Sequence, residues 1–114
     1  MSMTITERLL DDVVILDLAG RITIGEGTII LRERIQKMLN AGGKRFLLSL
    51  ADVDYIDSSG LGELVSSFTR VRNQEGELKL LELTRRVRDL MQITKLLTVF
   101  DVYDDEAAAI KSFR

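Results

Sequence analysis

The chain of 114 residues contains no histidine, no cysteine and no proline. Without cysteine, neither a disulfide nor a thiol nucleophile is available, which fits a reducing compartment. Without histidine, a Ser–His catalytic pair, a histidine-ligated metal and histidine phosphotransfer are all excluded. With no proline, no helix or strand is interrupted by that residue. These absences leave few kinds of catalytic chemistry open to the chain.

Long apolar runs and an excess of one charge are missing as well. No apolar run approaches the ~18–20 residues that a bilayer requires, and residues 1–5 lack the pattern of a signal peptide. The formal net charge is −2, so no basic surface points to a nucleic acid. We therefore expect a cytoplasmic protein with no nucleic-acid partner and no direct membrane insertion.

The residues that are present suit one compact domain over residues 1–114. Hydrophobic residues make up 46% of the chain and charged residues 30%, enough for a core and a hydrated surface. Alternating polarity predicts a half-buried strand over residues 3–9. A buried strand follows over residues 13–18 and ends at Gly20. The short polar break between the two strands predicts an antiparallel hairpin.

Helical and extended patterns then alternate to the end of the chain. A first helix is expected after residue 27, and residues 40–43 close it. A second helix is the amphipathic run that ends near Asn73. A third helix is expected over residues 85–93. Strands are expected at about 45–50, 78–83 and 99–103. A last helix should be capped by Asp104, with an apolar face of Ala107, Ala108 and Ile110.

This order, ββαβαβαβα, predicts an α/β fold. Strands that alternate with helices form mainly parallel sheets. We expect a mixed sheet of about five strands, mostly parallel, with the antiparallel first strand at one edge.

The most informative segment lies where the third strand passes into an amphipathic helix. It reads Asp57-Ser58-Ser59-Gly60-Leu61-Gly62. In open α/β sheets, ligands and partners meet the chain at the carboxyl ends of strands. Serines at a helix N-terminus face unpaired backbone N–H groups and the positive end of the helix dipole. A phosphate on one of them would be well placed.

A simpler role is open to the same residues, because serine and aspartate are both common helix caps. The two glycines favour a functional role. Glycine lowers helix stability by ~1 kcal/mol per residue relative to alanine, so two in one first turn need a reason. Bare backbone at Gly60 and Gly62 would give a partner close access to the Ser58 hydroxyl.

Common enzyme signatures are incomplete. The glycine pairs at residues 25–27 and 60–62 both lack the third glycine of a dinucleotide fingerprint, and no Gly-Lys-Ser or Gly-Lys-Thr phosphate loop is present. Asp52, Asp54 and Asp57 are candidate Mg²⁺ ligands, but the preference of aspartate for turns and helix starts explains them better. We expect no cofactor, no metal site and no catalytic activity.

The order of elements, the segment 57–62 and the ending Val99-Phe100-Asp101-Val102-Tyr103-Asp104 together resemble the STAS domain. More narrowly, the chain resembles bacterial anti-sigma factor antagonists over essentially its whole length. The resemblance implies that Ser58 is a phosphoacceptor. It also implies a partner-binding surface made of Thr23, Asp57, Ser58, Ser59, Gly60, Leu61 and Gly62. Thr23 is a departure, since many members carry an aspartate shortly after the glycine of the second strand.

The resemblance further implies three partners. The unphosphorylated form would bind an anti-sigma factor with serine kinase activity and so release a sigma factor, and a metal-dependent Ser/Thr phosphatase would reverse the phosphorylation. Stand-alone STAS proteins also serve as subunits of membrane lipid-transport complexes and of signalling assemblies. That alternative would use the same surface without phosphate chemistry.

Overall fold

The computed structural model describes residues 3–113 and contains the predicted order of elements. The strands and helices are β1 (Met3–Leu10), β2 (Val13–Ile22), α1 (Glu26–Asn40), β3 (Arg45–Ile56), α2 (Ser58–Asn73), β4 (Glu77–Leu81), α3 (Arg85–Ile93), β5 (Val102–Tyr103) and α4 (Glu106–Ser112). A short 3₁₀ helix, Leu96–Thr98, links α3 to β5.

The five strands form one sheet in the order β1-β2-β3-β4-β5. Strand β1 is antiparallel to β2, and every other neighbouring pair is parallel, as predicted. The β2–β3 pairing runs from Val13 opposite Arg45 to Ile22 opposite Ile56, with irregularities near Asp17 and Gly20. Because β2 and β3 end together, the segments that follow them meet at one end of the sheet.

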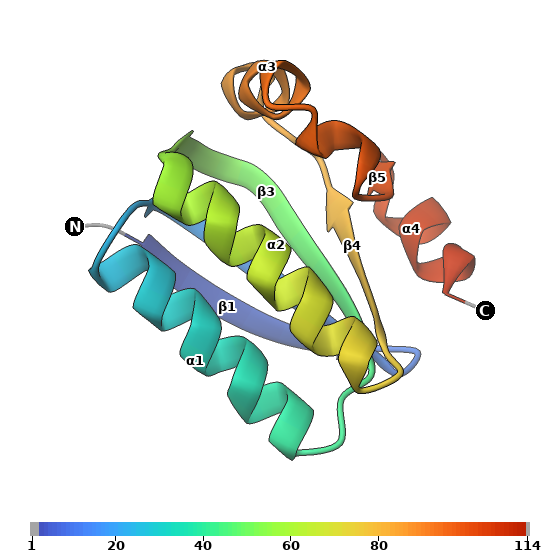
Figure 1. Cartoon of the computed structure of the whole chain (residues 1–114). Coiled ribbons are helices and arrows are strands. Elements are labelled where there is room, and N and C mark those ends of the chain that lie inside the picture. Colours follow the sequence, from blue (N-terminus) through green and yellow to red (C-terminus); the bar gives the residue numbers. More distant parts are fainter. Residues whose placement is uncertain (1–2, 114) are drawn as a thin grey trace.

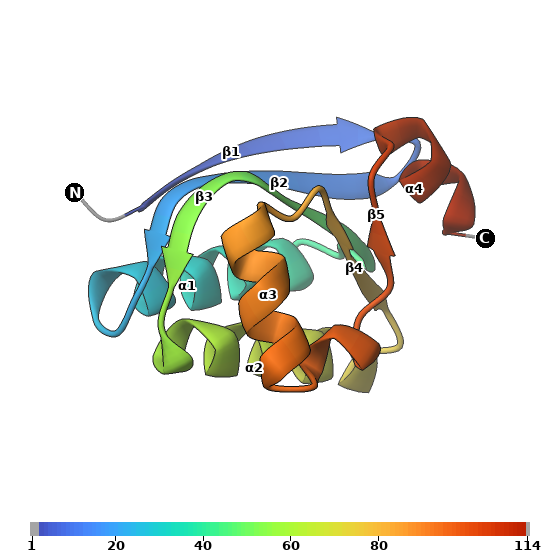
Figure 2. The ribbon, with the colours of Figure 1, turned by 90° about the horizontal axis from the view of Figure 1, so that it is seen from above.

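The two faces of the sheet are covered unequally. Helices α1 and α2 lie side by side across one face, and α3 lies on the same side of the strands (Figures 1 and 2). Alternate residues of the central strands, such as Leu16, Leu48 and Leu80, point into this larger core. Helix α4 covers part of the opposite face. The smaller core there consists of Val13, Ile15, Leu47, Leu81, Ala109, Ile110 and Phe113.

The central strands are longer than the sequence predicts. Strand β2 continues through Gly20 to Ile22, so Gly20, at φ 105°, forms an irregularity within the strand and does not end it. Strand β3 extends from the expected residue 50 to Ile56, although Asp52 and Asp54 interrupt its apolar run. Both carboxylates are exposed, while Val53 and Ile56 are buried. The partner strand thus sustains an extended backbone that the polarity pattern does not reveal.

The C-terminal elements also need correction. Strand β4 ends at Leu81, and β5 is limited to Val102–Tyr103. Asp105, not Asp104, caps α4, because its carboxylate accepts a hydrogen bond from the N–H of Ala108. The helix therefore begins one residue later than the sequence predicts.

The apolar face of α4 also differs from the expected one. Ala107 and Ala108 are exposed, whereas Ala109 and Ile110 are buried. The expected face was therefore correct for Ile110 and wrong for the two earlier alanines.

Candidate functional site

The segment 57–62 occupies the predicted strand-to-helix junction. Strand β3 ends at Ile56, and Ser58 and Ser59 are the first two residues of α2. Asp57 caps the helix, since one carboxylate oxygen, Oδ1, accepts a hydrogen bond from the N–H of Gly60 at 2.8 Å. The cap is thus supplied by the aspartate, and the serines are not needed for it.

The same carboxylate also holds the loop between β2 and α1. Its other oxygen, Oδ2, accepts a hydrogen bond from the backbone N–H of Ile24 at 3.0 Å. The N–H of Asp57 in turn donates to the carbonyl of Ile22 at 3.3 Å. Residues 33 positions apart in the sequence are therefore joined at the carboxyl ends of β2 and β3.

These contacts keep Asp57 ionised. The pKa of its carboxyl is lowered, chiefly by the hydrogen bond from Ile24 and further by the bond from Gly60, against the opposing effect of burial. A full negative charge therefore stands directly beside Ser58 at neutral pH.

Ser58 is exposed, and its hydroxyl has no hydrogen-bond partner within the described residues. Ser59 is half-buried. Of the two hydroxyls, that of Ser58 is therefore the more open to a modifying enzyme.

Gly60 and Leu61 point inward. A Cβ atom at Gly60 would lie 2.1 Å from the carbonyl oxygen of Ile22 and 2.8 Å from a methyl carbon of Ile56. The expectation that bare backbone at Gly60 gives a partner access is therefore wrong, because this glycine allows α2 to pack against β2. Leu61 is 5% exposed and belongs to the larger core.

Gly62 differs from Gly60, two residues earlier. It is exposed, and a Cβ atom there would meet nothing within 4 Å. Gly62 therefore leaves an open surface on the first turn of α2, as an access role requires.

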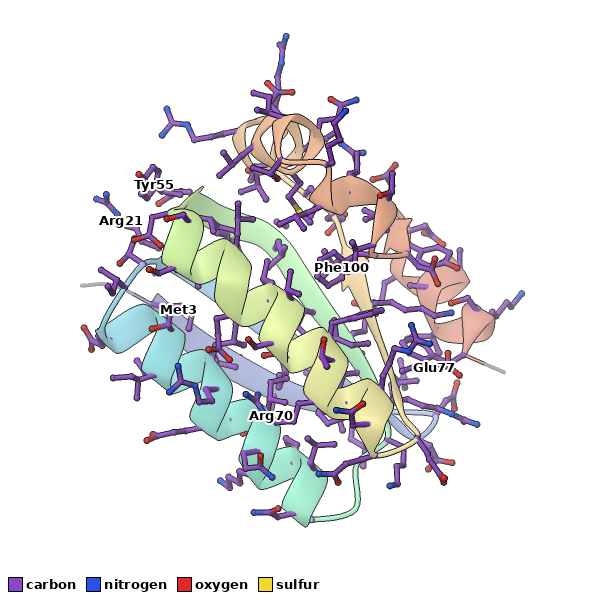
Figure 3. The ribbon with its side chains drawn as sticks, in the orientation of Figure 1. Met3, Arg21, Tyr55, Arg70, Glu77 and Phe100 are labelled. Atoms are coloured by element: carbon purple, nitrogen blue, oxygen red, sulfur yellow. The ribbon has the colours of Figure 1, made fainter. Side chains whose placement is uncertain are left out.

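The loop from β2 to α1 contributes residues that the sequence did not single out. Ile24 is 74% exposed, next to the half-buried Thr23. Near the ends of β2 and β3, the guanidinium of Arg21 lies 5.0 Å from the centre of the Tyr55 ring (Figure 3). Arg21 and Tyr55 are opposite each other in the β2–β3 register. No pattern in the sequence predicts this pairing.

Behind this surface, a nearly buried carboxylate joins α1 to α2. Glu63 is 5% exposed and accepts two hydrogen bonds from Arg32 of α1, at 3.1 and 3.2 Å. Arg70, about two turns farther along α2, approaches the other carboxylate oxygen at 3.7 Å. Ser67 donates to the same oxygen at 3.4 Å. The network fixes the helix that carries Ser58 against its neighbour.

No group of three or more potential acidic ligands is arranged for a metal ion within residues 3–113. Asp57 already accepts two backbone hydrogen bonds, so the structure gives no support to a Mg²⁺ site made with Asp52 and Asp54. The Asp57 carboxylate holds the loop and caps the helix instead.

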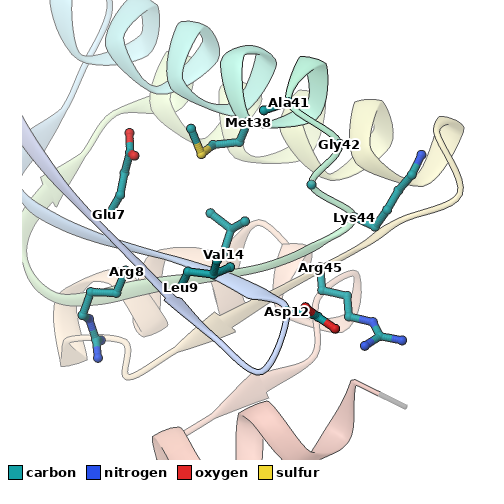
Figure 4. Close-up of a pocket in the computed structure, with 11 residues that line it drawn as sticks. Glu7, Arg8, Leu9, Asp12, Val14, Met38, Ala41, Gly42, Lys44 and Arg45 are labelled. Atoms are coloured by element: carbon teal, nitrogen blue, oxygen red, sulfur yellow. The ribbon is translucent and has the colours of Figure 1, made fainter.

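An open groove of about 720 Å³ lies elsewhere, between the β1–β2 hairpin and the segment that links α1 to β3 (Figure 4). Its lining includes Leu9, Met38 and Lys44. It lies at the amino ends of β2 and β3, the end of the sheet opposite to Ser58. The groove is therefore separate from the segment 57–62.

None of the helices within residues 3–113 is long and apolar enough to cross a membrane.

Comparison with solved structures finds a crystal structure of a putative anti-sigma factor antagonist from Thermotoga maritima. It is 27% identical, has a TM-score of 0.88, and the match covers 96% of this chain and 94% of that one. The anti-sigma factor antagonist SpoIIAA in its unphosphorylated form shares the fold, with a TM-score of 0.80 at 19% identity over 96% and 95% of the two chains.

Sequence comparison agrees. The model of the STAS domain matches residues 4–109. An anti-sigma-B factor antagonist from Bacillus subtilis is 36% identical over 75% of this chain and 77% of its own length. A putative antagonist from Thermotoga neapolitana is 30% identical over 91% and 92%. The chain therefore belongs to the STAS domain family and, within it, to the anti-sigma factor antagonists.

Proposed function

We propose that this chain is switched by phosphorylation of Ser58. Unphosphorylated, it binds an anti-sigma factor that has serine kinase activity and so frees a sigma factor. Phosphorylated, it is released, and a metal-dependent Ser/Thr phosphatase restores it. The observation that carries the proposal is the exposed, unpaired Ser58 hydroxyl at the start of α2, beside the ionised Asp57.

Electrostatics explains why one phosphate would suffice. A phosphoserine carries about −1.5 to −2 charges at neutral pH. In an interface that charge would have to lose water and face the Asp57 carboxylate. Each 1.4 kcal/mol of such a penalty weakens binding about tenfold.

The fold itself should tolerate the phosphate. The N-terminus of α2 favours a negative charge through its helix dipole. Ser58 is exposed, so no core contact has to move. Phosphorylation would thus change the surface and leave the packing intact.

Relatives support this assignment. The antagonists to which the chain is similar are named for opposing anti-sigma factors. SpoIIAA, which shares the fold, is described in both unphosphorylated and phosphorylated forms. For this chain we infer the same two states, with Ser58 as the modified residue.

The test uses the purified chain, an anti-sigma factor kinase from the same organism and ATP. We expect no labelling by ATP alone and labelling of Ser58 once the kinase is added. Ser58→Ala should bind the kinase and resist release, whereas Ser58→Asp should bind at least about tenfold more weakly. Ser59→Ala is the control and should still be labelled. Phosphate mapped to Ser59, or tight binding by Ser58→Asp, would contradict the proposal.

A further inference from the structure

Ile24 exposes a large apolar side chain in the loop that Asp57 joins to the start of α2, beside Ser58. It is 74% exposed, although Ile22, two residues earlier, is completely buried. A single exposed apolar residue is common on protein surfaces and needs no explanation by itself. The way in which the backbone of Ile24 is held sets this residue apart.

The loop that carries Ile24 is fixed from several sides. The N–H of Ile24 donates to Asp57, and the carbonyl of Thr23 accepts a hydrogen bond from Thr28 at 3.2 Å. The carbonyl of Ile22 accepts from the N–H of Asp57 and packs against Gly60. The loop is thus ordered before any partner arrives, which lowers the entropic cost of binding through it.

The loop at Ile24 and the first turn of α2, in which Ser58 lies, are held by the same side chain. One carboxylate oxygen of Asp57 binds the Ile24 N–H, and the other binds the first turn of α2. A partner that covers Ser58 would therefore meet Ile24 as part of one continuous surface.

We propose that Ile24 is an apolar anchor that enters an apolar pocket of the anti-sigma factor kinase, and that Asp57 is the positioning residue that holds it beside Ser58. This inference rests on the proposed function, which names the partner but gives Ile24 no role. Buried aliphatic or aromatic side chains at the centre of an interface commonly supply much of its binding energy.

Charge indicates the rim of that pocket. Asp52 and Asp54, on the last part of β3, are exposed and form no ion pair within the described residues. Arg85 and Arg86 are exposed at this end as well, because they follow Thr84, whose hydroxyl donates to the carbonyl of Val53. This end of the sheet therefore carries charges of both signs, and Asp57 is the carboxylate bonded directly to the Ile24 N–H. The fitting partner surface is an apolar pocket with a cationic group facing Asp57 and with charges of both signs on the rest of its rim.

The anchor is tested by Ile24→Ala, with Leu9→Ala as the matched control. Leu9 is 73% exposed and lies at the opposite end of the sheet. We expect Ile24→Ala to bind the anti-sigma factor kinase at least about tenfold more weakly, because a buried aliphatic side chain is lost. Leu9→Ala should bind within about twofold of the parent chain. Both variants should keep the thermal stability of the parent.

The positioning role is tested by hydrogen exchange of backbone amides in the free protein. In Asp57→Ala, the amides of Ile24 and Gly60 should exchange faster, while the amide of Leu80, bonded to Asp101, should not change. In a double-mutant cycle, Asp57→Ala should weaken kinase binding less when Ile24 is already alanine. An unchanged Ile24 amide, or fully additive losses of binding, would overturn the positioning role.

The outcomes separate the anchor from the proposed function. If the parent chain binds the kinase and Ile24→Ala binds equally tightly, the anchor is wrong and the switch at Ser58 stands. If the parent chain does not bind such a kinase at all, the proposed function is wrong and the anchor fails with it. The amide exchange decides in either case whether Asp57 holds the loop.

Discussion

The two ends of the sheet are built from the same strands and differ in how their polar groups are used. At the carboxyl ends of β2 and β3, Asp57 collects backbone N–H groups from a loop and a helix, and Ser58 beside it keeps a free hydroxyl. At the amino ends, charged side chains pair with groups nearby. Glu7 meets Arg34 at 2.8 Å, and Lys44 donates to the carbonyl of Gln74 at 2.7 Å.

The difference explains why the larger hollow is not the stronger candidate site. The groove at the amino ends has volume, but much of its polar lining is already paired. The carboxyl ends offer a rigid frame that presents the exposed, unpaired hydroxyl of Ser58 and the exposed apolar side chain of Ile24. Groups that are already held in place lower the entropic cost of binding a protein partner, which needs no deep pocket.

The largest expected effect tests the packing of the carboxyl ends. Gly60→Ala places a methyl group 2.1 Å from the Ile22 carbonyl oxygen, so either α2 or β2 must move. We expect the free energy of unfolding to fall by about 3 kcal/mol, measured by urea denaturation. A stability loss below that of an ordinary surface substitution would show that α2 can shift freely at this point.

The next effect concerns the Asp57 carboxylate. Asp57→Ala removes the cap of α2 and the bond to Ile24, so we expect a loss of about 1–2 kcal/mol at neutral pH. Asp57→Asn keeps one acceptor oxygen and should lose less. Equal losses in both variants would mean that charge, and not the acceptor geometry, is the stabilising feature.

The stabilisation by Asp57 should also depend on pH. Because its pKa is lowered in the folded state, the contribution is complete above the pKa of the unfolded chain and is lost as pH falls through the folded pKa. The stability difference between the parent and Asp57→Asn should therefore shrink as the pH is taken below about 4. A difference that stays constant down to pH 2 would contradict a charged Asp57.

The sequence also predicts some parts of this structure better than others. The apolar periodicity located the helices and the core, and the change from strand to helix located the segment 57–62. The length of β3 could not be predicted, because Asp52 and Asp54 are exposed residues of a strand whose pairing with β2 maintains the extended backbone. The pattern of polar and apolar residues indicates which side chains are buried. It indicates only indirectly which strands pair through backbone hydrogen bonds.

The same limit applies to the site. Gly60 and Gly62 look equivalent in the sequence, yet only the register of β2 against β3 brings the Ile22 carbonyl onto Gly60. The bond from Ile24 to Asp57 spans 33 residues and follows from that register too. Local propensity correctly predicted where the serines lie and could not predict what holds them.

A smaller effect is expected at Gly62, which contrasts with Gly60. Gly62→Ala puts a better helix former into open space, so stability should stay level or rise by up to ~1 kcal/mol. Kinase-catalysed labelling of Ser58 and binding should nevertheless fall, because a methyl group then occupies the contact surface. Thermal unfolding and labelling are measured on the same variant. Clear destabilisation with labelling at the normal rate would show that Gly62 serves the backbone and not access.

The smallest effect is expected at the amino ends. Asp11 and Asp12 form the β1–β2 turn with φ of 51° and 66°, a conformation that favours glycine. Asp12→Gly should relieve this strain, and the greater freedom of glycine in the unfolded chain should offset part of the gain, leaving about 0.5 kcal/mol. Asp12→Ala, the control, should lose stability because alanine tolerates this conformation less well than aspartate.

Both variants should be labelled at Ser58 like the parent chain, since the turn lies at the far end of the sheet. Slower labelling of a stably folded Asp12→Gly would show that the two ends are coupled and that the kinase contacts both.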